Sequence, residues 1–432
     1  MNKTVEKGKT LLVDGPASVT VTSGTAEVFG STVESRGKVV IREGKRLPFT
    51  AKETIILEIS LGENASVEEV DGNTIPQSWT EAYEQLLNFQ SKPVVAMVLG
   101  TVDSGKTSFC TYLTNRLLQE KQKVAILDGD LGQSDIGPPC TVAYTFLTKP
   151  VTDLFNLEAK NAFFIGYTSP SLAINKVIEG VTSLKREILD GNPDFIVINT
   201  DGWIEGEDAV NYKVQLVKEL NPHIIFCIQQ KDELTPILNS LEGFQKIVVE
   251  SPPTIKQRSR EKRRSLRELG YIKYLKNAKV QTLPISWLKI EANEFFGLGT
   301  SHENTRQAKK TYELLGMKPL HFAELKDKVC MVIGVGRWIR EENIKKLEEA
   351  FGKKVVVFRK GEEEGLLLAL YNNERKFLGI GILREIDYGR KTLKIFTPVS
   401  EKISTVALGR VKLDKNLKET PAFTEEVAFV KL

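Results

Sequence analysis

One segment of the chain has the residue types and spacing of a phosphate-binding loop. Glycine lets backbone N–H groups close around an anion, the lysine can reach outer phosphates, and the following hydroxyl can ligate Mg²⁺. The alternative is a tight glycine turn with a solvated lysine. The segment fits G-x-x-x-x-G-K-[ST], and the predicted nucleotide-binding residues are Gly100, Thr101, Val102, Asp103, Ser104, Gly105, Lys106, Thr107 and Ser108.

Two acids follow the next apolar run, Val124-Ala125-Ile126-Leu127, about twenty residues past this loop. Side chains two apart on a strand share a face, so Asp128 and Asp130 are expected to point together toward a metal ion and the reacting phosphate. Thr107, Asp128 and Asp130 are the predicted Mg²⁺ ligands, and Asp130 or Asp128 could accept a proton. The alternative is a capping acid at a strand end. Gln133 could orient a nucleophile or a metal-bound water.

The densest positive charge lies in residues 256–267, which hold seven basic residues against one acid. If this run is helical, its basic residues fall around the whole circumference, so it has little apolar face to bury and is held mainly by what it binds. A lid over phosphates fits, because a guanidinium can bridge phosphate oxygens as charge redistributes. A solvated basic helix is the competing interpretation.

Two further segments follow apolar runs and could contact a polymer. Trp203 closes the segment Asn199-Thr200-Asp201-Gly202-Trp203, and a tryptophan at the ligand-bearing edge of a sheet can stack on a base; a core tryptophan is the alternative. Thr168 and Ser169 offer hydroxyls and backbone N–H groups to a phosphodiester, or alternatively only a helix cap.

The elements that must position these residues predict an α/β fold. An apolar run at 93–99 and helical spacing at 108–118 present the glycine loop at a helix N-terminus. Further strands at 124–127, 195–198 and 224–228 alternate with helical stretches such as 171–189, which is typical of a parallel sheet. Alternating stretches before residue 70 and after residue 329 predict β-rich regions on both sides. The predicted domains are 1–75, an N-terminal β domain; 76–310, a P-loop kinase domain; and 311–432, a C-terminal β-rich domain.

Composition limits the function classes. With 41% hydrophobic and 27% charged residues and no long apolar run, a membrane role is not expected. The N-terminus lacks an apolar signal-peptide region, so a cytoplasmic location is the expectation. The four cysteines show no C-x-x-C spacing and are predicted to be buried thiols, and three histidines give a His-based centre little material.

Together these motifs resemble the polynucleotide 5′-hydroxyl kinases related to the RNA kinase subunit of the messenger-RNA 3′-end cleavage machinery and to the ribosomal-RNA processing kinase, with an archaeal-type member as the nearest likeness. The order and spacing match. The matching elements are residues 100–108 as the P-loop, Asp130-Leu131-Gly132-Gln133 as the Walker B segment, Thr168-Ser169-Pro170 as a substrate clasp, 199–203 as the strand bearing a base-stacking tryptophan, and 258–263 as the lid.

The resemblance implies that ATP–Mg²⁺ donates its γ-phosphate to the free 5′-hydroxyl of RNA or DNA. Lys106, Arg258 and Arg263 would neutralise the transferring group, and Asp130 would accept the hydroxyl proton. Trp203 would hold a terminal base, with Gln133, Thr168 and Ser169 on the nucleic acid.

Asp201 departs from the small uncharged residue expected at its position, and is interpreted as either an extra metal contact or a solvated acid. Two alternatives to the kinase remain. One is a nucleotide-bound, non-catalytic scaffold with RNA-processing protein partners. The other is an NTPase switch, although no Asn-Lys-x-Asp guanine signature supports GTP.

Overall fold

The computed structural model describes residues 1–291, 305–337 and 339–421. Its contacts divide the chain into two compact units, Met1–Gly270 and Tyr271–Leu432. The predicted division into three domains stays a prediction. The four cysteines are free and buried, as predicted.

The N-terminal part of the first unit is all β, as its alternating sequence predicts. It forms two antiparallel sheets, ordered β1-β8-β3-β6 and β5-β4-β7-β2-β9. Alternate residues of β3 and β8 are buried, because successive side chains of a strand point to opposite faces. The strands are β1 (Asn2–Val5), β2 (Lys9–Asp14), β3 (Ala17–Ser23), β4 (Ala26–Val28), β5 (Ser31–Val33), β6 (Lys38–Ile41), β7 (Arg46–Ala51), β8 (Ile55–Leu61) and β9 (Val67–Asp71).

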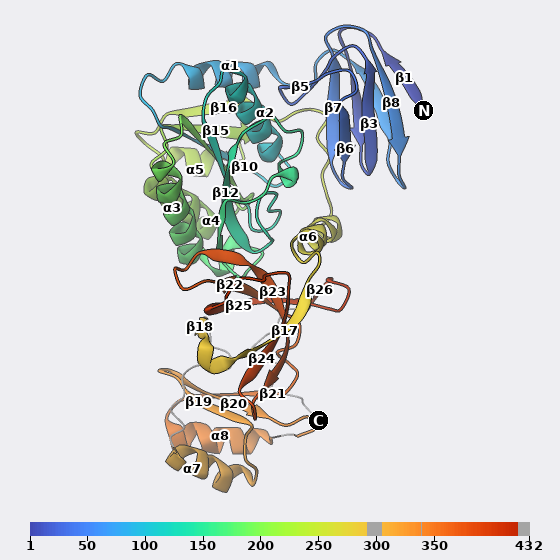
Figure 1. The fold of residues 1–432 in the computed structure, drawn as a ribbon. Helices are drawn as coiled ribbons and strands as arrows, with labels where there is room; N and C mark the ends of the chain where they lie inside the picture. Colours follow the sequence, from blue (N-terminus) through green and yellow to red (C-terminus); the bar gives the residue numbers. More distant parts are fainter. Residues whose placement is uncertain (292–304, 338, 422–432) are drawn as a thin grey trace. The chain divides into compact units, whose positions relative to one another are not determined.

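The rest of the first unit is an α/β domain around a seven-stranded sheet, ordered β13-β12-β11-β14-β10-β15-β16 (Figure 1). The strands are β10 (Val94–Gly100), β11 (Val124–Gly129), β12 (Thr141–Leu147), β13 (Asn161–Phe164), β14 (Phe195–Thr200), β15 (Ile224–Gln229) and β16 (Lys246–Glu250). The helices are α1 (Gln77–Leu87), α2 (Lys106–Gln119), α3 (Ile174–Asp190), α4 (Glu207–Leu220), α5 (Thr235–Asn239) and α6 (Arg260–Tyr274), with single 3₁₀ turns η1 (Leu154–Asn156) and η2 (Pro170–Leu172).

The pairing confirms the predicted parallel core and adds an antiparallel edge. Strand β10 pairs in parallel with both β14 and β15, and β11 pairs in parallel with β14. Strand β12 runs antiparallel to β11 and β13, which the sequence analysis did not anticipate. The carboxyl ends of β10, β11 and β14 therefore meet at one edge of the sheet, where ligands bind in folds of this class.

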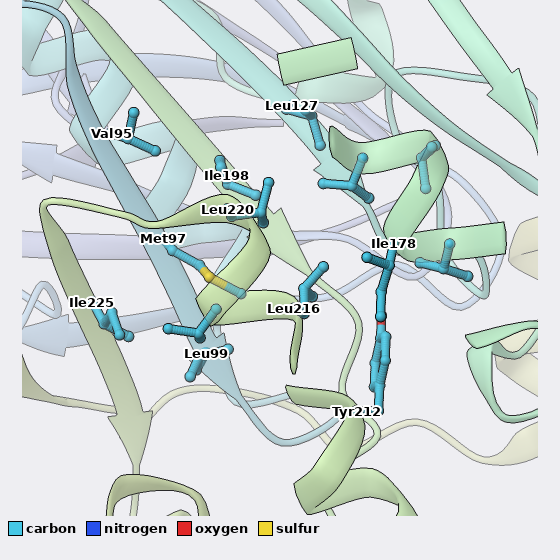
Figure 2. Packing of buried hydrophobic residues seen from close by; sticks show 14 of the residues in the cluster. Val95, Met97, Leu99, Leu127, Ile178, Ile198, Tyr212, Leu216, Leu220 and Ile225 are labelled. Carbon is cyan, nitrogen blue, oxygen red and sulfur yellow. The ribbon is translucent and has the colours of Figure 1, made fainter. Parts of the chain in front are cut away.

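Helices cover both faces of this sheet. Alternate residues of the central strands form one buried cluster with α3, α4 and α5; Figure 2 shows Met97 of β10 and Leu216 of α4 within it. On the other face, Phe109 of α2 packs edge-to-face on Phe226 of β15 and against Trp79 of α1, with ring centroids 5.3 and 5.0 Å apart. The sheet is thus a rigid base for the loops at its edge.

The second unit is β-rich, as predicted, but also contains a β-α-β unit. Strands β20 and β21 are parallel, and α8 connects them. The larger sheet is ordered β17-β24-β23-β22-β25-β18, so β17 and β18, which the predicted boundary at 310 assigned to the kinase domain, pair with C-terminal strands. The elements are β17 (Lys279–Pro284), η3 (Ile285–Trp287), β18 (Lys289–Glu291), α7 (Thr305–Leu315), β19 (His321–Glu324), β20 (Lys328–Ile333), α8 (Glu341–Phe351), β21 (Lys354–Arg359), β22 (Leu366–Tyr371), β23 (Phe377–Asp387), β24 (Thr392–Thr397), β25 (Thr405–Leu413) and β26 (Glu419–Thr420).

Candidate functional site

A cavity of about 520 Å³ lies at the glycine loop, within the first unit. This size is in the range of small-molecule sites. Among the predicted site residues, its lining includes Val102, Asp103, Ser104, Gly105, Lys106, Thr107, Ser108, Asp130, Gln133 and Arg258. The N-terminal β domain also lines it, through Asp14 and the turn after β6, which the sequence analysis did not anticipate.

The glycine loop has the geometry of an anion cradle. It connects β10 to α2, and Gly105 caps α2 with φ of +101°. The backbone N–H groups at the start of α2 therefore face the end of the sheet, and a helix N-terminus favours negative charge. The Ser104 hydroxyl is buried and, within the described residues, has no hydrogen-bond partner. A phosphate oxygen would satisfy it.

Neighbouring segments approach the loop so closely that only glycine fits. A Cβ on Gly202 would lie 2.5 Å from the Val102 nitrogen, so the segment after β14 packs directly on the loop. A Cβ on Gly100 would lie 2.6 Å from the Ser104 Oγ and 2.7 Å from the Ile228 carbonyl oxygen. The loop is held from both neighbouring strands, which fixes its shape before any ligand binds.

Lys106 is almost completely buried, with 6% of its surface exposed. Its ammonium donates to the Thr101 carbonyl oxygen. Burial lowers the pKa of Lys106, while the carboxylate of Asp130 opposes this shift. A buried ammonium is costly unless it is paired, so a phosphate in the cavity would stabilise the charged form.

Of the two acids at the carboxyl end of β11, Asp130 is in the described lining of the cavity and Asp128, within the strand, is not. Its Oδ1 accepts from the backbone N–H groups of Gly132 and Gln133, both at 3.0 Å. Burial raises the pKa of the Asp130 carboxyl, and Lys106 acts in the opposite direction. A carboxyl group whose pKa is moved upward is better suited to accept a proton.

Asp128 is completely buried, and both its oxygens are occupied. Oδ1 accepts from the Asp130 N–H at 3.2 Å and from the Asn199 amide at 3.1 Å, and Oδ2 accepts from the N–H groups of Asp135 at 2.7 Å and Ile136 at 3.3 Å. Burial raises the pKa of this carboxyl to about 7, against these donors. The arrangement shapes the loop that carries Asp130.

Asn199 is a site residue that the sequence analysis did not single out. Its side-chain amide donates to Asp128 at 3.1 Å and to the Thr107 Oγ1 at 3.3 Å. It therefore connects Asp128 of β11 to the Thr107 hydroxyl of the glycine loop. Its position at the end of the central strand β14 was the available signal, because that strand lies between β11 and β10.

The two lid arginines converge on a P-loop carboxylate. Arg258 donates from its backbone N at 3.0 Å and its Nη1 at 3.1 Å to Asp103, and the same Nη1 donates to the Gln133 Oε1 at 2.9 Å. Arg263 donates to Asp103 at 3.4 Å and to the Arg258 carbonyl at 2.6 Å. The Asp103 side chain is 2% exposed and its φ is +56°. This carboxylate thus holds both guanidinium groups at the loop.

The lid differs in one respect from its predicted form. Helix α6 begins at Arg260, so Arg258 lies just before the helix. The difference is that the helix buries apolar surface. Leu266 is 8% exposed, and a Cβ on Gly44 would lie 2.9 Å from its Cδ2. A Cβ on Gly270 would lie 2.8 Å from Pro139. The expectation of little apolar contact was wrong, because basic side chains surround a narrow apolar stripe.

Of the predicted nucleic-acid residues, Gln133 is in the described lining of the cavity, whereas Thr168, Ser169 and Trp203 are not. A Cβ on Gly132 would lie 3.3 Å from the Thr168 carbonyl oxygen, so Thr168 adjoins the loop that carries Asp130. Trp203 is half-buried and stacks on Tyr212, with ring centroids 5.7 Å apart and an interplanar angle of 25°.

Asp201 requires a correction, because it is neither solvated nor open to a metal. It is 4% exposed, and its Oδ2 accepts from the Lys213 ammonium at 2.8 Å and the Tyr212 hydroxyl at 2.8 Å. Its Oδ1 accepts from the Trp203 N–H at 2.9 Å. This buried network fixes the segment that carries Trp203.

The side chains at the cavity are compatible with a metal ion that binds together with the phosphates of a nucleotide. Among the described residues, no group of three or more His, Cys, Asp or Glu side chains could hold a metal ion. Mg²⁺ commonly binds through one or two protein ligands together with substrate phosphates and waters. Thr107 and Asp130 at the cavity wall are compatible with that mode. In the described part of the chain, no helix combines the length and apolarity needed to span a membrane.

Comparisons with known proteins agree with this geometry. Residues 100–277 match the family described as mRNA cleavage and polyadenylation factor CLP1 P-loop. The chain is 28% identical over 353 residues to a polyribonucleotide 5′-hydroxyl-kinase of Methanocaldococcus jannaschii, covering 80% of this chain and 94% of that one. It is 28% identical over 348 residues to a protein of the same description from Pyrococcus furiosus, with 80% and 94% covered.

A solved structure shares the fold. In the complex of wild-type Clp1p with Pcf11p residues 454–563, the similar chain aligns with a TM-score of 0.64 at 14% identity, covering 95% of this chain and 97% of that one. The predicted fold class and the predicted family resemblance are therefore confirmed.

Proposed function

With residues 100–277 matched to the CLP1 P-loop family, we propose that the protein is a polynucleotide 5′-hydroxyl kinase that uses ATP and Mg²⁺. The archaeal relatives named polyribonucleotide 5′-hydroxyl-kinase, which align over 80% of this chain, support this activity. The observation that carries it is the convergence of Lys106, Asp130 and Arg258 on one cavity.

The chain's own residues divide the work of phosphoryl transfer. ATP–Mg²⁺, when bound, would supply the transferable γ-phosphoryl group, with ADP as the leaving group. Lys106 binds its outer phosphates, and Thr107, positioned by Asn199, supplies a metal-ligating hydroxyl. Asp130 accepts the proton of the attacking 5′-hydroxyl at its carboxylate. Arg258 and Arg263 leave Asp103 and neutralise the charge that spreads over the transferred group.

The acceptor is the 5′-hydroxyl end of RNA or DNA. Thr168 lies beside the loop of Asp130, and Thr168 and Ser169 would grip the backbone of the terminal nucleotides. Trp203, fixed by Asp201, would stack on a base, which tolerates varied sequence. RNA-processing protein partners are a further part of this proposal, supported by the Clp1p–Pcf11p complex of the structural relative.

The test is direct phosphate transfer. The full-length protein is incubated with Mg²⁺, γ-labelled ATP and a short oligonucleotide carrying a 5′-hydroxyl, beside the same oligonucleotide already 5′-phosphorylated, as RNA and as DNA. We expect label on the hydroxyl forms alone and none with Lys106→Ala. Tight ATP binding without transfer would instead support a non-catalytic scaffold, and phosphate release without an acceptor would support an NTPase.

A further inference from the structure

A turn of the N-terminal β domain contacts the lid. This turn, residues 42–45 between β6 and β7, lines the cavity wall. The Arg258 Nε donates to the Gly44 carbonyl oxygen at 3.2 Å, and the Lys262 ammonium pairs with the Glu43 carboxylate. Leu266 packs against Gly44. A backbone carbonyl, a charge and an apolar contact from one turn therefore hold three successive parts of the lid.

The same turn also holds the loop that follows Asp130. Arg42 donates from Nε to Asp153 at 2.7 Å and pairs with Asp135, and its guanidinium lies 4.5 Å from the centroid of the Phe155 ring. The Lys45 ammonium lies 3.3 Å from Asp153 and 3.7 Å from Asp135. Asp135, Asp153 and Lys45 are each at most 9% exposed.

A backbone N–H group connects this ion cluster to strand β11. The Asp135 N–H donates to the Asp128 carboxylate at 2.7 Å. Two cations from the N-terminal domain thus balance two acids of the P-loop domain, one of which adjoins β11. Buried ion pairs contribute little to stability compared with apolar packing, but they require a defined geometry. Such a cluster at the cavity wall fixes orientation.

We propose that residues 42–45 are a positioning element of the kinase site, which sets the lid with Glu43 and Gly44 and the Asp130 loop with Arg42 and Lys45. This inference rests on the proposed function. It makes the N-terminal β domain part of the catalytic unit, since the lid arginines and the proposed base must meet at the same transferred group. None of the four residues is a catalytic residue, because each acts through another.

Gly44 gives the most specific test. Its φ is +72°, and a Cβ there would lie 2.9 Å from the Leu266 Cδ2 and 3.3 Å from the Lys262 Cε. Gly44→Ala therefore strains the backbone and also displaces the lid. Gly8 is a matched control, because its φ is +86° and a Cβ there would meet nothing within 4 Å. Gly8→Ala has the backbone strain alone.

Two readouts are measured on the full-length variants. The first is the rate of trypsin cleavage within residues 256–267 without nucleotide, since cleavage reports the population of undocked lid. The second is 5′-hydroxyl phosphorylation, resolved into kcat and KM. We expect Gly44→Ala to be cleaved at least five-fold faster than Gly8→Ala, with kcat about ten-fold lower and equal thermal unfolding midpoints. Equal cleavage and equal kcat in the two variants would overturn the proposal.

A charge exchange tests the turn without touching glycine. Glu43 is exposed, so Glu43→Lys is expected to fold, and it places two cations together at Lys262. We expect two- to five-fold faster lid cleavage, restored by the double variant Glu43→Lys/Lys262→Glu. Absence of restoration would overturn the role of Glu43. If the wild-type protein transfers no phosphate, the proposed function fails, while the cleavage rates still decide whether the turn holds the lid.

Discussion

Two lysines are buried near the carboxyl edge of the sheet, and their surroundings differ. At the glycine loop, the Lys106 ammonium has, within the described residues, a backbone carbonyl as its hydrogen-bond acceptor, and burial lowers its pKa. In the middle of α4, Lys213 is fully buried, and its ammonium lies 2.8 Å from the carboxylate and 2.9 Å from the carbonyl oxygen of Asp201, which follows β14. Among the residues that the structure describes, no carboxylate contacts the Lys106 ammonium, whereas the Asp201 carboxylate contacts that of Lys213.

This difference distinguishes a region suited to bind a ligand, around Lys106, from a region that supports the fold, around Lys213. Near Lys106, the Ser104 hydroxyl has no hydrogen-bond partner in the described part of the chain, and the lid arginines pair with Asp103 of the loop itself. An anion would therefore improve the electrostatics of the glycine loop. The Asp201 network is already satisfied, so it can hold Trp203 in place but gains nothing from a ligand. Variants in the first region should change activity, and variants in the second should change stability first.

The largest expected effect is that of Lys106→Ala. Removing the cation that we propose binds the outer phosphates should lower kcat by about 10³-fold. The fold should be retained, since Lys106 has no ion-pair partner among the described residues that its removal would leave unpaired. Label transfer and a thermal melt measure the two quantities. Lys218→Ala, on the exposed side of α4, is the matched control and should keep wild-type activity. A large drop in melting temperature for Lys106→Ala would remove the contrast between the regions.

Asp130→Asn is expected to follow closely. Loss of a general base lowers kcat by about 10²–10⁴-fold, and the amide keeps an oxygen for the Gly132 and Gln133 N–H groups. The unfolding midpoint should change little. Asp128→Asn is the comparison, because it places an NH₂ group against backbone donors and should cost about 1–3 kcal/mol of stability. Wild-type turnover by Asp130→Asn would exclude it as the base.

Lys213→Met should act mainly on stability. It leaves the buried Asp201 carboxylate unpaired, and breaking a buried ion pair by removing one partner costs about 3–5 kcal/mol. Denaturant unfolding measures this loss. The double variant Asp201→Leu/Lys213→Met leaves no isolated charge, so it should recover much of the stability. A double variant as unstable as the single one would show that volume, not charge, dominates this region.

The fold was largely predictable because its signals are local. The apolar runs of β10, β11, β14 and β15 and the spacing of α2 required no tertiary information. The antiparallel β12 was not predicted, since an apolar strand does not encode its direction. The pairing of β17 with the C-terminal strand β24 is not encoded locally for a similar reason, because β24 lies more than a hundred residues later.

The same distinction applies to the site. Residues 102–108, Asp130 and Arg258 are recognisable from contiguous motifs, and the structure brings them to one cavity. The pairing of Asp201 with Lys213 and the contact of Gly44 with Leu266 join segments that no motif connects. A carboxylate has the same sequence signature whether it binds metal or a buried lysine, so only packing decides between them.

The smallest effect is expected from Trp203→Ala, which tests the boundary between the two regions. Trp203 belongs to the satisfied network through its N–H and its stacking on Tyr212, yet it is half-exposed. If its open side stacks on a base, the variant should raise the KM for nucleic acid by an amount that corresponds to about 1–3 kcal/mol, with a smaller change in the KM for ATP. Steady-state kinetics with each substrate varied in turn measure both constants. Trp287→Ala removes an exposed indole from the second unit and is the matched control. An unchanged KM for nucleic acid together with a lower unfolding midpoint would show that Trp203 has only a structural role. Base stacking would then have to come from another residue.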